Sequence, residues 1–300
     1  MNQEHAALIA LLRTRPNGLN WRKLTEQVLE YGSASEVWDF FNPPQLIPAP
    51  AAGAALGQAT ADLDEWDRDG MRFLSVLDKE FPHRLLDIVE TPPFLFGRGR
   101  VEADDLGMSV VGSRKASSRA LEMAAGIANY LVGKGLTVIS GLAVGIDTAA
   151  HRAALDASGR TVAFVASGLT RTYPAENAGL QADIIDHGGL VLSQFLPGAP
   201  PRKQHFLMRN ALMSGYGLAT IVVEAGEYSG ARAQARMAVD HGRPVILTDL
   251  VYQANDWARD LAKRPGVHVA ASLKEIDELV EEIRSEPGRL DAALRQLAFQ

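Results

Sequence analysis

The chain has 300 residues, of which 47% are hydrophobic and 22% charged, and this composition is typical of a globular protein. The complete absence of cysteine excludes disulfides, cysteine nucleophiles and cysteine-ligated metal sites. No apolar run approaches the roughly 20 residues of a membrane-spanning helix, and the N-terminus lacks the apolar core of a signal peptide, so we expect a cytoplasmic protein without a membrane segment.

The net charge of −6 is unevenly distributed along the chain. Residues 1–105 carry a net charge of −7 and residues 271–300 one of −3, whereas residues 106–270 carry +4. The local potential at a binding surface matters more than the charge of the whole chain. The middle segment is therefore the part that we expect to meet an anionic partner.

Apolar residues at helical spacing predict short helices over residues 4–41, which form a small helical N-terminal domain at 1–42. These helices fit either a cap on the next domain or a module that touches DNA. Residues 43–60 are uncharged and rich in proline, alanine and glycine, which predicts a linker. An extension follows at 61–105, with an acidic helix, a strand near 71–77 and a proline-bounded segment expected to add an edge strand to the next domain.

Strands and helices alternate over residues 106–270, the predicted sheet core. The expected strands are Met108–Val111, Thr137–Ile139, Thr161–Ala166, Leu190–Ser193, Thr220–Val223 and Pro244–Leu247. The expected helices lie near 117–133, 147–157, 177–186, 205–214 and 231–241. Continuous apolar strands are buried on both faces, and their alternation with helices requires right-handed crossovers. The sequence therefore predicts an α/β fold with a doubly wound, mainly parallel sheet. A helix at 272–285 completes the core of 61–285, and a helical tail follows at 286–300.

Turns rich in glycine and polar residues follow the predicted strands. They are Gly112–Lys115, Ser140–Asp147, Ser167–Leu169 with Tyr173–Asn177, Phe195–Asn210 and Glu224–Gly230. Ligands of open α/β sheets bind outside the carboxyl ends of the strands. Glycine lets the backbone approach a ligand, and helix N-termini near Ser117, Asp147 and Ser229 offer N–H groups to an anion. With the neighbouring arginines and lysines, these turns predict a phosphate-binding surface.

Several common site motifs are absent from the sequence. There is no G-x-G-x-x-G dinucleotide motif, no G-x-x-x-x-G-K-[ST] loop and no H-E-x-x-H pair. Asp147 and His151 stand four residues apart on one predicted helix face. This spacing favours a hydrogen bond between them under the glycine turn, with Asp147 as helix cap, over a metal site. We therefore expect no cofactor and no metal.

Five motifs in a fixed order resemble the DprA/Smf family of DNA-processing proteins over residues 61–250. They include S-V-V-G-S-R-K at 109–115, S-G-x-A-x-G-I-D-x-x-A-H at 140–151, Y-P-x-E-N at 173–177, R-N at 209–210 and V-V-E-A…S-G at 222–230. The resemblance implies a Rossmann-like core that binds single-stranded DNA in a basic pocket and that is not an enzyme. It also implies a homodimer that loads the RecA recombinase onto incoming strands during natural transformation.

The resemblance also implies roles for individual residues. Arg114, Lys203, Phe206 and Arg209 would contact DNA, and the turn residues Gly112, Ser113, Lys115, Gly141, Arg202, Asn210, Ser229 and Gly230 complete the predicted DNA- or phosphate-binding set. Asp147, His151, Glu176, Asn177 and Glu224 would shape the pocket. Phe206 is the expected base-stacking residue, although its place at the start of a helix equally fits core packing.

The sequence departs from the family pattern at several positions. Ala211 replaces the second arginine of R-N-R, Gln194 replaces a glutamate, Thr248 and Asp249 replace P-G, and Arg232 is an additional cation. About 30 residues follow the sheet core at 106–270, too few for the C-terminal winged helix of many members. These departures suggest a divergent, shortened member. Such proteins also resemble components of phage-defence and toxin–antitoxin loci.

Two alternative functions remain. One is a DprA-like antitoxin or phage-defence regulator that binds a nucleotide, DNA or a cognate toxin. The other is a nucleotide phosphoribohydrolase that uses Arg209 and Glu224, although Glu227–Ala231 stands where those enzymes have P-G-G-x-G-T. The apolar residues Val239, Ile276, Leu279, Val280 and Ile283 offer more apolar face than a terminal segment needs, which favours a homodimer.

Overall fold

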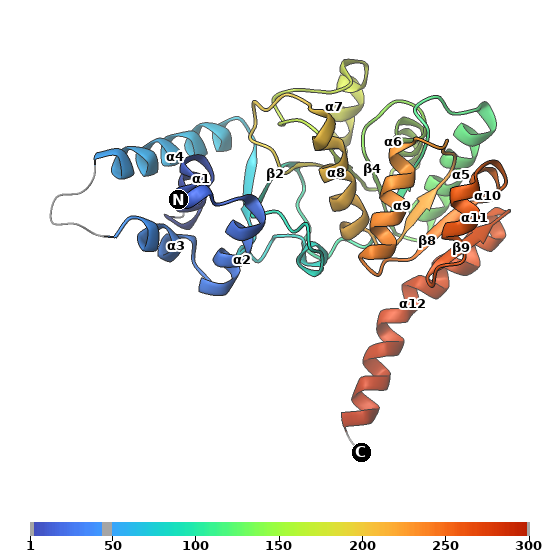
Figure 1. Ribbon diagram of the computed structural model, residues 1–300. Coiled ribbons are helices and arrows are strands. Elements are labelled where there is room, and N and C mark those ends of the chain that lie inside the picture. The colour runs from blue at the N-terminus through green and yellow to red at the C-terminus, as the bar shows by residue number, and fades with distance from the viewer. Residues whose placement is uncertain (1–2, 44–49, 299–300) are drawn as a thin grey trace.

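The protein is built around one nine-stranded sheet with the strand order β1-β2-β6-β5-β4-β3-β7-β8-β9 (Figure 1). The computed structural model describes residues 3–43 and 50–298, with side chains at 3–43 and 52–285. The strands are β1 (Arg72–Ser75), β2 (Phe94–Gly99), β3 (Gly107–Val111), β4 (Thr137–Ser140), β5 (Thr161–Phe164), β6 (Leu190–Ser193), β7 (Thr220–Val222), β8 (Val245–Thr248) and β9 (Val267–Ala270).

Strands β3 to β9 pair in parallel, whereas β2 is antiparallel to β6 and β1 is antiparallel to β2. From β3 the chain winds outward through β4, β5 and β6, and it then returns to β7 and winds the other way. This confirms the predicted α/β class with a doubly wound, mainly parallel sheet. The strand order reverses between β3 and β7, which is where folds of this kind bind ligands.

Helices cover both faces of the sheet. They are α5 (Ser118–Gly133), α6 (Ile146–Asp156), α7 (Ala178–Asp186), α8 (Lys203–Tyr216), α9 (Gly230–Asp240), α10 (Asp249–Ala254), α11 (Asp256–Leu261) and α12 (Leu273–Ala298), with short 3-10 turns η2 (His83–Asp87) and η3 (Ala175–Asn177). Buried residues of α5, α6 and α12 form one hydrophobic cluster, and those of α8, α9 and α11 belong to another. The sequence did not predict β9, α10 or α11.

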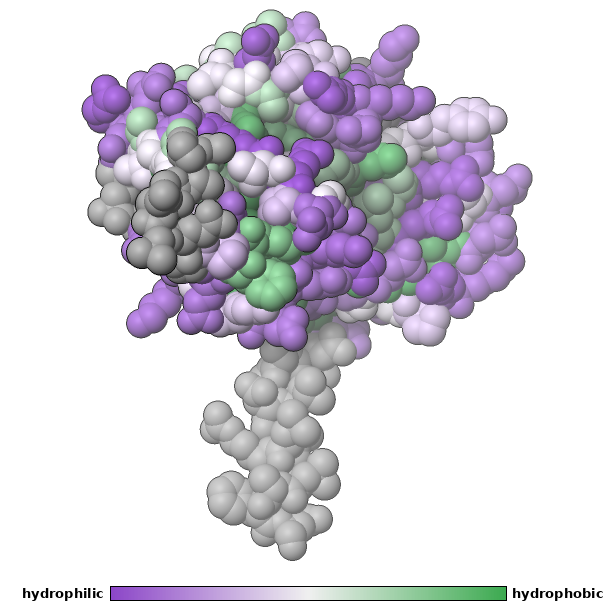
Figure 2. All heavy atoms as spheres, turned by 60° about the vertical axis from the view of Figure 1, so that its left-hand side comes forward, coloured by the Kyte–Doolittle hydropathy of each residue, from purple (hydrophilic) through white to green (hydrophobic). Residues whose placement is uncertain are grey.

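Four helices pack against the β1–β2 end of the sheet (Figure 1). They are α1 (Gln3–Thr14), α2 (Trp21–Tyr31), α3 (Ala34–Phe41) and α4 (Pro50–Arg68), with the turn η1 (Pro16–Gly18) after α1. Trp21 lies 5.7 Å from the ring of Phe94, and Trp66 lies 5.0 Å from that of Phe96. One hydrophobic cluster therefore runs from these helices into the sheet. Figure 2 shows this end of the molecule as mainly hydrophilic, with separate apolar patches.

The predicted linker at 43–60 is wrong from Pro50 onward, because these residues begin helix α4. Residues 44–49 lie outside the described part of the chain. Ala59 and Leu63 are buried in the cluster that joins the N-terminal helices to the sheet. Alanine is the best helix former, and its abundance here outweighs the glycine and proline content on which the linker prediction rested.

Helix α12 continues without interruption to Ala298, so residues 286–298 of the predicted separate tail at 286–300 extend this helix, and the last two residues lie outside the described part of the chain. The apolar face of α12 is used inside the chain, since Ile276, Val280 and Ile283 are buried against α5 and the sheet. The spare apolar face expected here is therefore absent from the described part of α12. No helix among the described residues is both long and apolar enough to cross a membrane.

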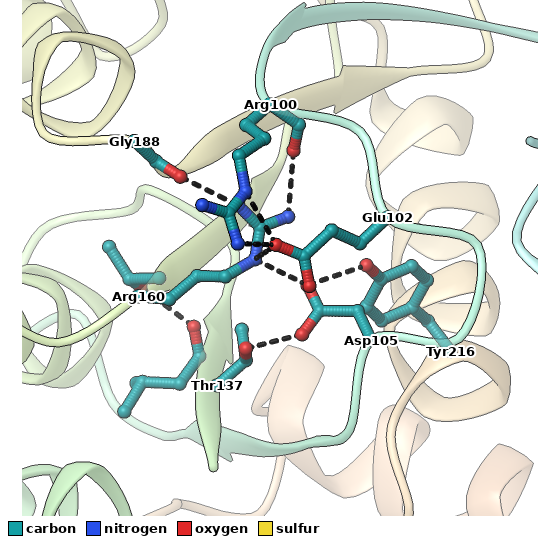
Figure 3. Close-up of polar contacts among 9 residues, drawn as sticks. Arg100, Glu102, Asp105, Thr137, Arg160, Gly188 and Tyr216 are labelled. Carbon is teal, nitrogen blue, oxygen red and sulfur yellow. Dashed lines mark hydrogen bonds and ion pairs between the residues drawn. The ribbon is translucent and has the colours of Figure 1, made fainter. Parts of the chain in front are cut away.

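A buried polar cluster ties the segment before β3 to the amino-terminal ends of the parallel strands (Figure 3). Asp105 accepts hydrogen bonds from Arg160 Nε at 2.8 Å, from Tyr216 Oη at 3.1 Å and from the Thr137 hydroxyl. Arg160 also donates to the carbonyl oxygens of Gly188 and Arg100 at 2.6 and 2.8 Å. Burial, followed by the Asp105 charge, raises the pKa of the Tyr216 phenol well above its usual value, so the phenol keeps its proton. The cluster therefore holds together the amino-terminal ends of the parallel strands, opposite their carboxyl ends.

Candidate functional site

A pocket of about 600 Å³ opens beside the carboxyl ends of β3 and β7, where the strand order reverses. It is lined by residues 111–115 after β3, by Ala143 and Asp147 near α6, by Phe206, Arg209, Asn210 and Met213 of α8, and by residues 226–231 and Gln234 around the start of α9. Three loops and three helices, α6, α8 and α9, thus converge on one cavity. Its position is the one at which open α/β sheets bind their ligands.

The turn after β3 is held by close backbone packing. A Cβ atom on Gly145, whose φ is +83°, would lie 2.3 Å from the carbonyl oxygen of Ser113, so only glycine fits there. The amide of Ile146 donates to the same oxygen at 3.2 Å. This contact joins the β3 turn to the start of α6 and leaves Arg114 and Lys115 exposed at the mouth of the pocket.

Glu224 does not line the pocket but ties two of its walls together. Its carboxylate accepts from the Ser117 amide at 3.1 Å and from the Ser117 hydroxyl at 2.6 Å, and its carbonyl accepts from the Ser113 amide at 2.7 Å. A carboxylate therefore already occupies the N-terminus of α5, where the sequence predicted N–H groups free for a ligand anion. The pocket-shaping role of Glu224 stays a prediction, and these contacts are the ones through which the residue would exert it.

The floor of the pocket is a buried arginine rather than an exposed one. Arg209 is 6% exposed, and its Nη1 donates to the Gly141 carbonyl oxygen and, at 3.2 Å, to that of Phe164. A Cβ atom on Gly141 would lie 1.5 Å from this Nη1, so the turn after β4 must have glycine there to admit the guanidinium. Arg209 lines the pocket, but its strongest contacts are with the protein backbone.

Asp147 holds the other side of this turn. Its Oδ2 accepts from the amides of Gly141 at 3.2 Å and Ala143 at 3.3 Å, on either side of Leu142, which has a φ of +55°. Burial raises the pKa of the Asp147 carboxyl, and the nearby Arg209 charge and the two amides oppose this rise. Asp147 therefore holds a turn that contains a residue with positive φ, and its role in shaping a ligand pocket stays a prediction.

His151 is fully buried beneath the same turn, away from the pocket lining. Burial, and then the charge of Arg209, lowers the pKa of His151 to about 3, so the ring is neutral at physiological pH. The Thr161 hydroxyl donates to the Val138 carbonyl at 2.7 Å, which leaves His151 Nδ1 to donate to Thr161 Oγ1 at 2.7 Å. The hydrogen bond predicted between Asp147 and His151 is absent from the contacts of the described residues. No cluster of three metal-ligating side chains occurs among them either.

Phe206 is half-buried and faces the pocket, so it is not a core residue. The guanidinium carbon of Arg114 lies 5.1 Å from the centre of its ring, and that of Arg209 lies 5.9 Å away. The ring of Tyr173 forms a T-shaped contact with the same ring, with 5.7 Å between the two centroids. An aromatic face bordered by cations is a surface on which a nucleobase can stack while its phosphates are neutralised.

The structure brings most, but not all, of the predicted site residues together. Gly112, Ser113, Arg114, Lys115, Phe206, Arg209, Asn210, Ser229, Gly230 and Asp147 line the pocket. Gly141, Arg202, Lys203, His151, Glu176, Asn177 and Glu224 do not. Arg202 and Lys203 are exposed at the start of α8, and Glu176 is exposed in η3. Asn177 is buried and donates to the Leu142 carbonyl at 2.9 Å, so it supports the turn above Arg209.

The sequence reasoning missed Tyr228, Ala143, Met213 and Gln234 as pocket residues. Tyr228 lies in the turn that was singled out after β7, and an aromatic residue in such a turn was the available signal. The cations at the pocket mouth are free of carboxylate partners in the described chain, since no ion pair there includes Arg114 or Lys115. Their charge is therefore open to an anionic ligand.

Comparison with known proteins places this architecture in a family. The sequence profile of the DNA recombination-mediator protein A family matches residues 72–284. The chain belongs to this family. The match covers the whole parallel part of the sheet and every element that lines the pocket, which agrees with the resemblance noted in the sequence.

Curated relatives cover the same region. DNA processing protein DprA of Streptococcus pneumoniae is 39% identical over 173 residues, which are 57% of this chain and 61% of the relative. Protein Smf of Synechocystis is 34% identical over 189 residues, which are 61% of this chain and 47% of the relative. The chain thus matches about half to three fifths of the length of these relatives.

Two solved structures share the fold. The X-ray structure of DNA processing protein A from Streptococcus pneumoniae superimposes with a TM-score of 0.66 at 30% identity, covering 90% of this chain and 95% of that one. A structure from Helicobacter pylori, described for its single-stranded DNA binding mode, gives a TM-score of 0.62 at 23% identity and covers 71% of this chain and 96% of that one. The likeness to the second structure concerns the fold alone.

Proposed function

We propose that this protein is a non-catalytic binder of single-stranded DNA that acts in DNA processing and recombination. The observation that carries the proposal is the pocket at the reversal of strand order, where Arg114 and Lys115, which form no ion pair among the described residues, lie at the mouth beside the half-buried ring of Phe206, with the Arg114 guanidinium over that ring. Proteins that bind single-stranded nucleic acid commonly combine cations that contact the phosphate backbone with aromatic rings on which bases stack. Membership of the recombination-mediator family supports the same reading.

The contacts of Arg209 and Glu224 argue against the nucleotide-hydrolase alternative. That reaction would need both side chains free to meet a nucleotide. Instead, the Arg209 guanidinium is bound to the Gly141 and Phe164 carbonyls, and the Glu224 carboxylate caps α5 through Ser117. A catalytic arginine and carboxylate must touch the reacting group, and these two are engaged in holding the walls of the pocket.

The binding is expected to depend steeply on salt, because phosphate contacts release counterions. For single-stranded DNA, the slope of log K against log salt is about −0.7 per neutralised phosphate. Arg114→Ala should make this slope shallower by about one contact and cost about 1–2 kcal/mol of affinity. Fluorescence anisotropy with a labelled oligonucleotide at several salt concentrations measures both quantities.

Arg259→Ala is the matched control for this experiment. Arg259 carries the same charge but lies in α11, outside the pocket lining, where it pairs with Asp256. The control should keep the slope and the affinity of the unmodified protein. Equal effects of the two substitutions would show that only overall charge matters, and a protein that binds no oligonucleotide at low salt would overturn the proposed function.

We further propose that the protein is a homodimer that transfers its bound strand to the RecA recombinase, as the family resemblance implies. Because Ile276, Val280 and Ile283 are buried inside the chain, these residues of α12 do not supply the dimer surface. Light scattering at micromolar concentration should give twice the mass of a single chain. A monomer mass would remove the dimer and, with it, the main support for the loading step.

A further inference from the structure

Tyr228 stands out at the rim of the pocket as an aromatic side chain without a packing role. It is 99% exposed, whereas the next most exposed large hydrophobic side chain of the described residues, Val89, is 68% exposed. Single exposed apolar residues are ordinary on protein surfaces, so exposure alone would mean little. What distinguishes Tyr228 is that it lines the same cavity as Phe206 and Arg114.

The loop that carries Tyr228 is fixed on both sides of the residue. The Ser229 amide donates to the Gly226 carbonyl at 3.1 Å, which closes a turn with Tyr228 inside it. Arg232 Nη1 donates to the Glu227 carbonyl at 2.8 Å and also pairs with the Glu227 carboxylate. The backbone is therefore held in place while the ring stays in solvent.

Further hydrogen bonds hold the backbone on either side of this turn, at Ala225 and at Ser229. Asn255 Nδ2 donates to the Ala225 carbonyl at 2.8 Å, and the Ser229 hydroxyl accepts from the Ala231 amide at 3.2 Å as the N-cap of α9. None of these contacts uses the side chain of Tyr228. A rigid loop that presents a free ring binds with little loss of backbone entropy, because the ordering is already done in the unbound protein.

We propose that Tyr228 stacks on an unpaired nucleobase held in the pocket, as a second aromatic surface beside Phe206. The phosphates that flank this base would lie at Arg114 and Lys115, the exposed cations at the same mouth. The inference rests on the proposed binding of single-stranded DNA and goes further, because it makes part of the affinity depend on the bases themselves. The bases of a duplex already stack on one another, so Tyr228 favours single strands.

In this proposal, the loop after β7 contacts the ligand directly through the Tyr228 ring. Arg232, the cation that departs from the family pattern, acts as a positioning residue in this scheme because it holds the Glu227 carbonyl next to the tyrosine. Phosphate contacts alone would bind an abasic strand as well as an intact one. An aromatic contact distinguishes the two, and this difference provides the test.

The experiment compares four proteins on two ligands. The proteins are the unmodified chain, Tyr228→Ala, Tyr228→Phe and the control Phe40→Ala, which removes another exposed aromatic ring from helix α3, outside the pocket lining. The ligands are a labelled single-stranded oligonucleotide and the same backbone with abasic sites. On the intact strand, Tyr228→Ala should bind about tenfold more weakly, and Tyr228→Phe and Phe40→Ala should bind like the unmodified protein. On the abasic strand, all four proteins should bind alike.

Each contrary outcome has a separate meaning. If the unmodified protein binds the intact strand and Tyr228→Ala binds equally well, the stacking role is wrong while the proposed function stands. If Tyr228→Ala weakens binding of both strands equally, or if Tyr228→Phe loses as much affinity as alanine, the contact is not base stacking. If the unmodified protein binds neither strand, the proposed function falls and this inference falls with it. Thermal unfolding of Tyr228→Ala and Tyr228→Phe should match that of the unmodified protein, because the Tyr228 side chain is almost fully exposed.

Discussion

Replacing Asp105 by alanine is expected to lower the free energy of unfolding by about 3–5 kcal/mol. The Asp105 side chain is 3% exposed and pairs with Arg160, which is 15% exposed, so the substitution leaves a buried guanidinium without its principal partner. The hydroxyl groups of Thr137 and Tyr216 lose their acceptor at the same time. Glu102, 3.7 Å from Arg160, remains as a weaker partner and places the effect toward the lower end of the range. Urea denaturation measures the change as a lower midpoint with an unchanged slope.

Asp104→Ala is the matched control for Asp105→Ala. Asp104 is 79% exposed and pairs with His83 at the surface, so Asp104→Ala should change stability by less than about 1 kcal/mol. Below its melting temperature, Asp105→Ala should still bind DNA, because the cluster lies at the amino-terminal ends of the strands and the pocket at their carboxyl ends. Similar stability losses in the two variants would show that the cluster contributes no more than a surface ion pair.

The sheet core was predictable because its signals are local. Runs of three to six mainly apolar residues mark strands that are buried on both faces, and the six strands β3 to β8 were predicted from them. The strand expected near 71–77 and the edge strand expected after it correspond to β1 and β2. Strand β9 was missed because Val267–Ala270 is short, includes His268 and is only partly buried. At the edge of a sheet, such a segment lacks the continuous apolar pattern of a central strand.

The sequence predicted where the pocket lies, but it predicted the roles of the individual site residues only in part. The position of a pocket follows from topology, since every parallel strand ends at the same edge of the sheet. The state of a charged side chain depends instead on partners far away in the sequence. Glu224 is held by Ser117, and Arg209 by Gly141 and Phe164, none of which is near in sequence.

Arg209 shows how this limits the reasoning from motifs. The family resemblance implied that Arg209 contacts a phosphate of the DNA, which is the usual role of an arginine in such a motif. Nothing local reveals that two strand-end carbonyls enclose its guanidinium. The missing side chain of Gly141 is the one signal that could have suggested it, because a turn with no Cβ atom leaves room for another group as well as for a ligand.

Replacing Arg209 by methionine should therefore act first on stability and only then on binding. At neutral pH we expect the free energy of unfolding to fall by about 3–5 kcal/mol, because two buried carbonyl oxygens lose their donor and the Asp147 carboxylate loses the charge that opposes its burial. Arg236→Met is the control, since Arg236 is exposed on α9 and belongs to no ion pair of the described residues. This change should stay within about 0.5 kcal/mol.

The loss of stability in Arg209→Met should become smaller as the pH falls. Burial raises the folded-state pKa of Asp147 above the ordinary value for a carboxyl group. The contribution of Asp147 to stability therefore declines as the pH rises from that ordinary value through the folded-state pKa. Without Arg209 this pKa rises further, and the decline extends over a wider range of pH. Removing the same charge also relieves His151, whose pKa Arg209 helps to hold down at about 3, so protonation of His151 at low pH costs the variant less.

The Asp147 effect makes the difference between Arg209→Met and the unmodified protein larger at pH 7 than at pH 5, whereas the His151 effect acts near pH 3, below this range. Denaturation curves at the two pH values, with oligonucleotide binding measured on the folded fraction, separate a positioning residue from a DNA contact. A variant that is as stable as the unmodified protein at both pH values, yet binds DNA more weakly, would make Arg209 a direct phosphate ligand. A stability loss that shrinks toward pH 5 would identify it as the residue that shapes the turn on which the pocket is built.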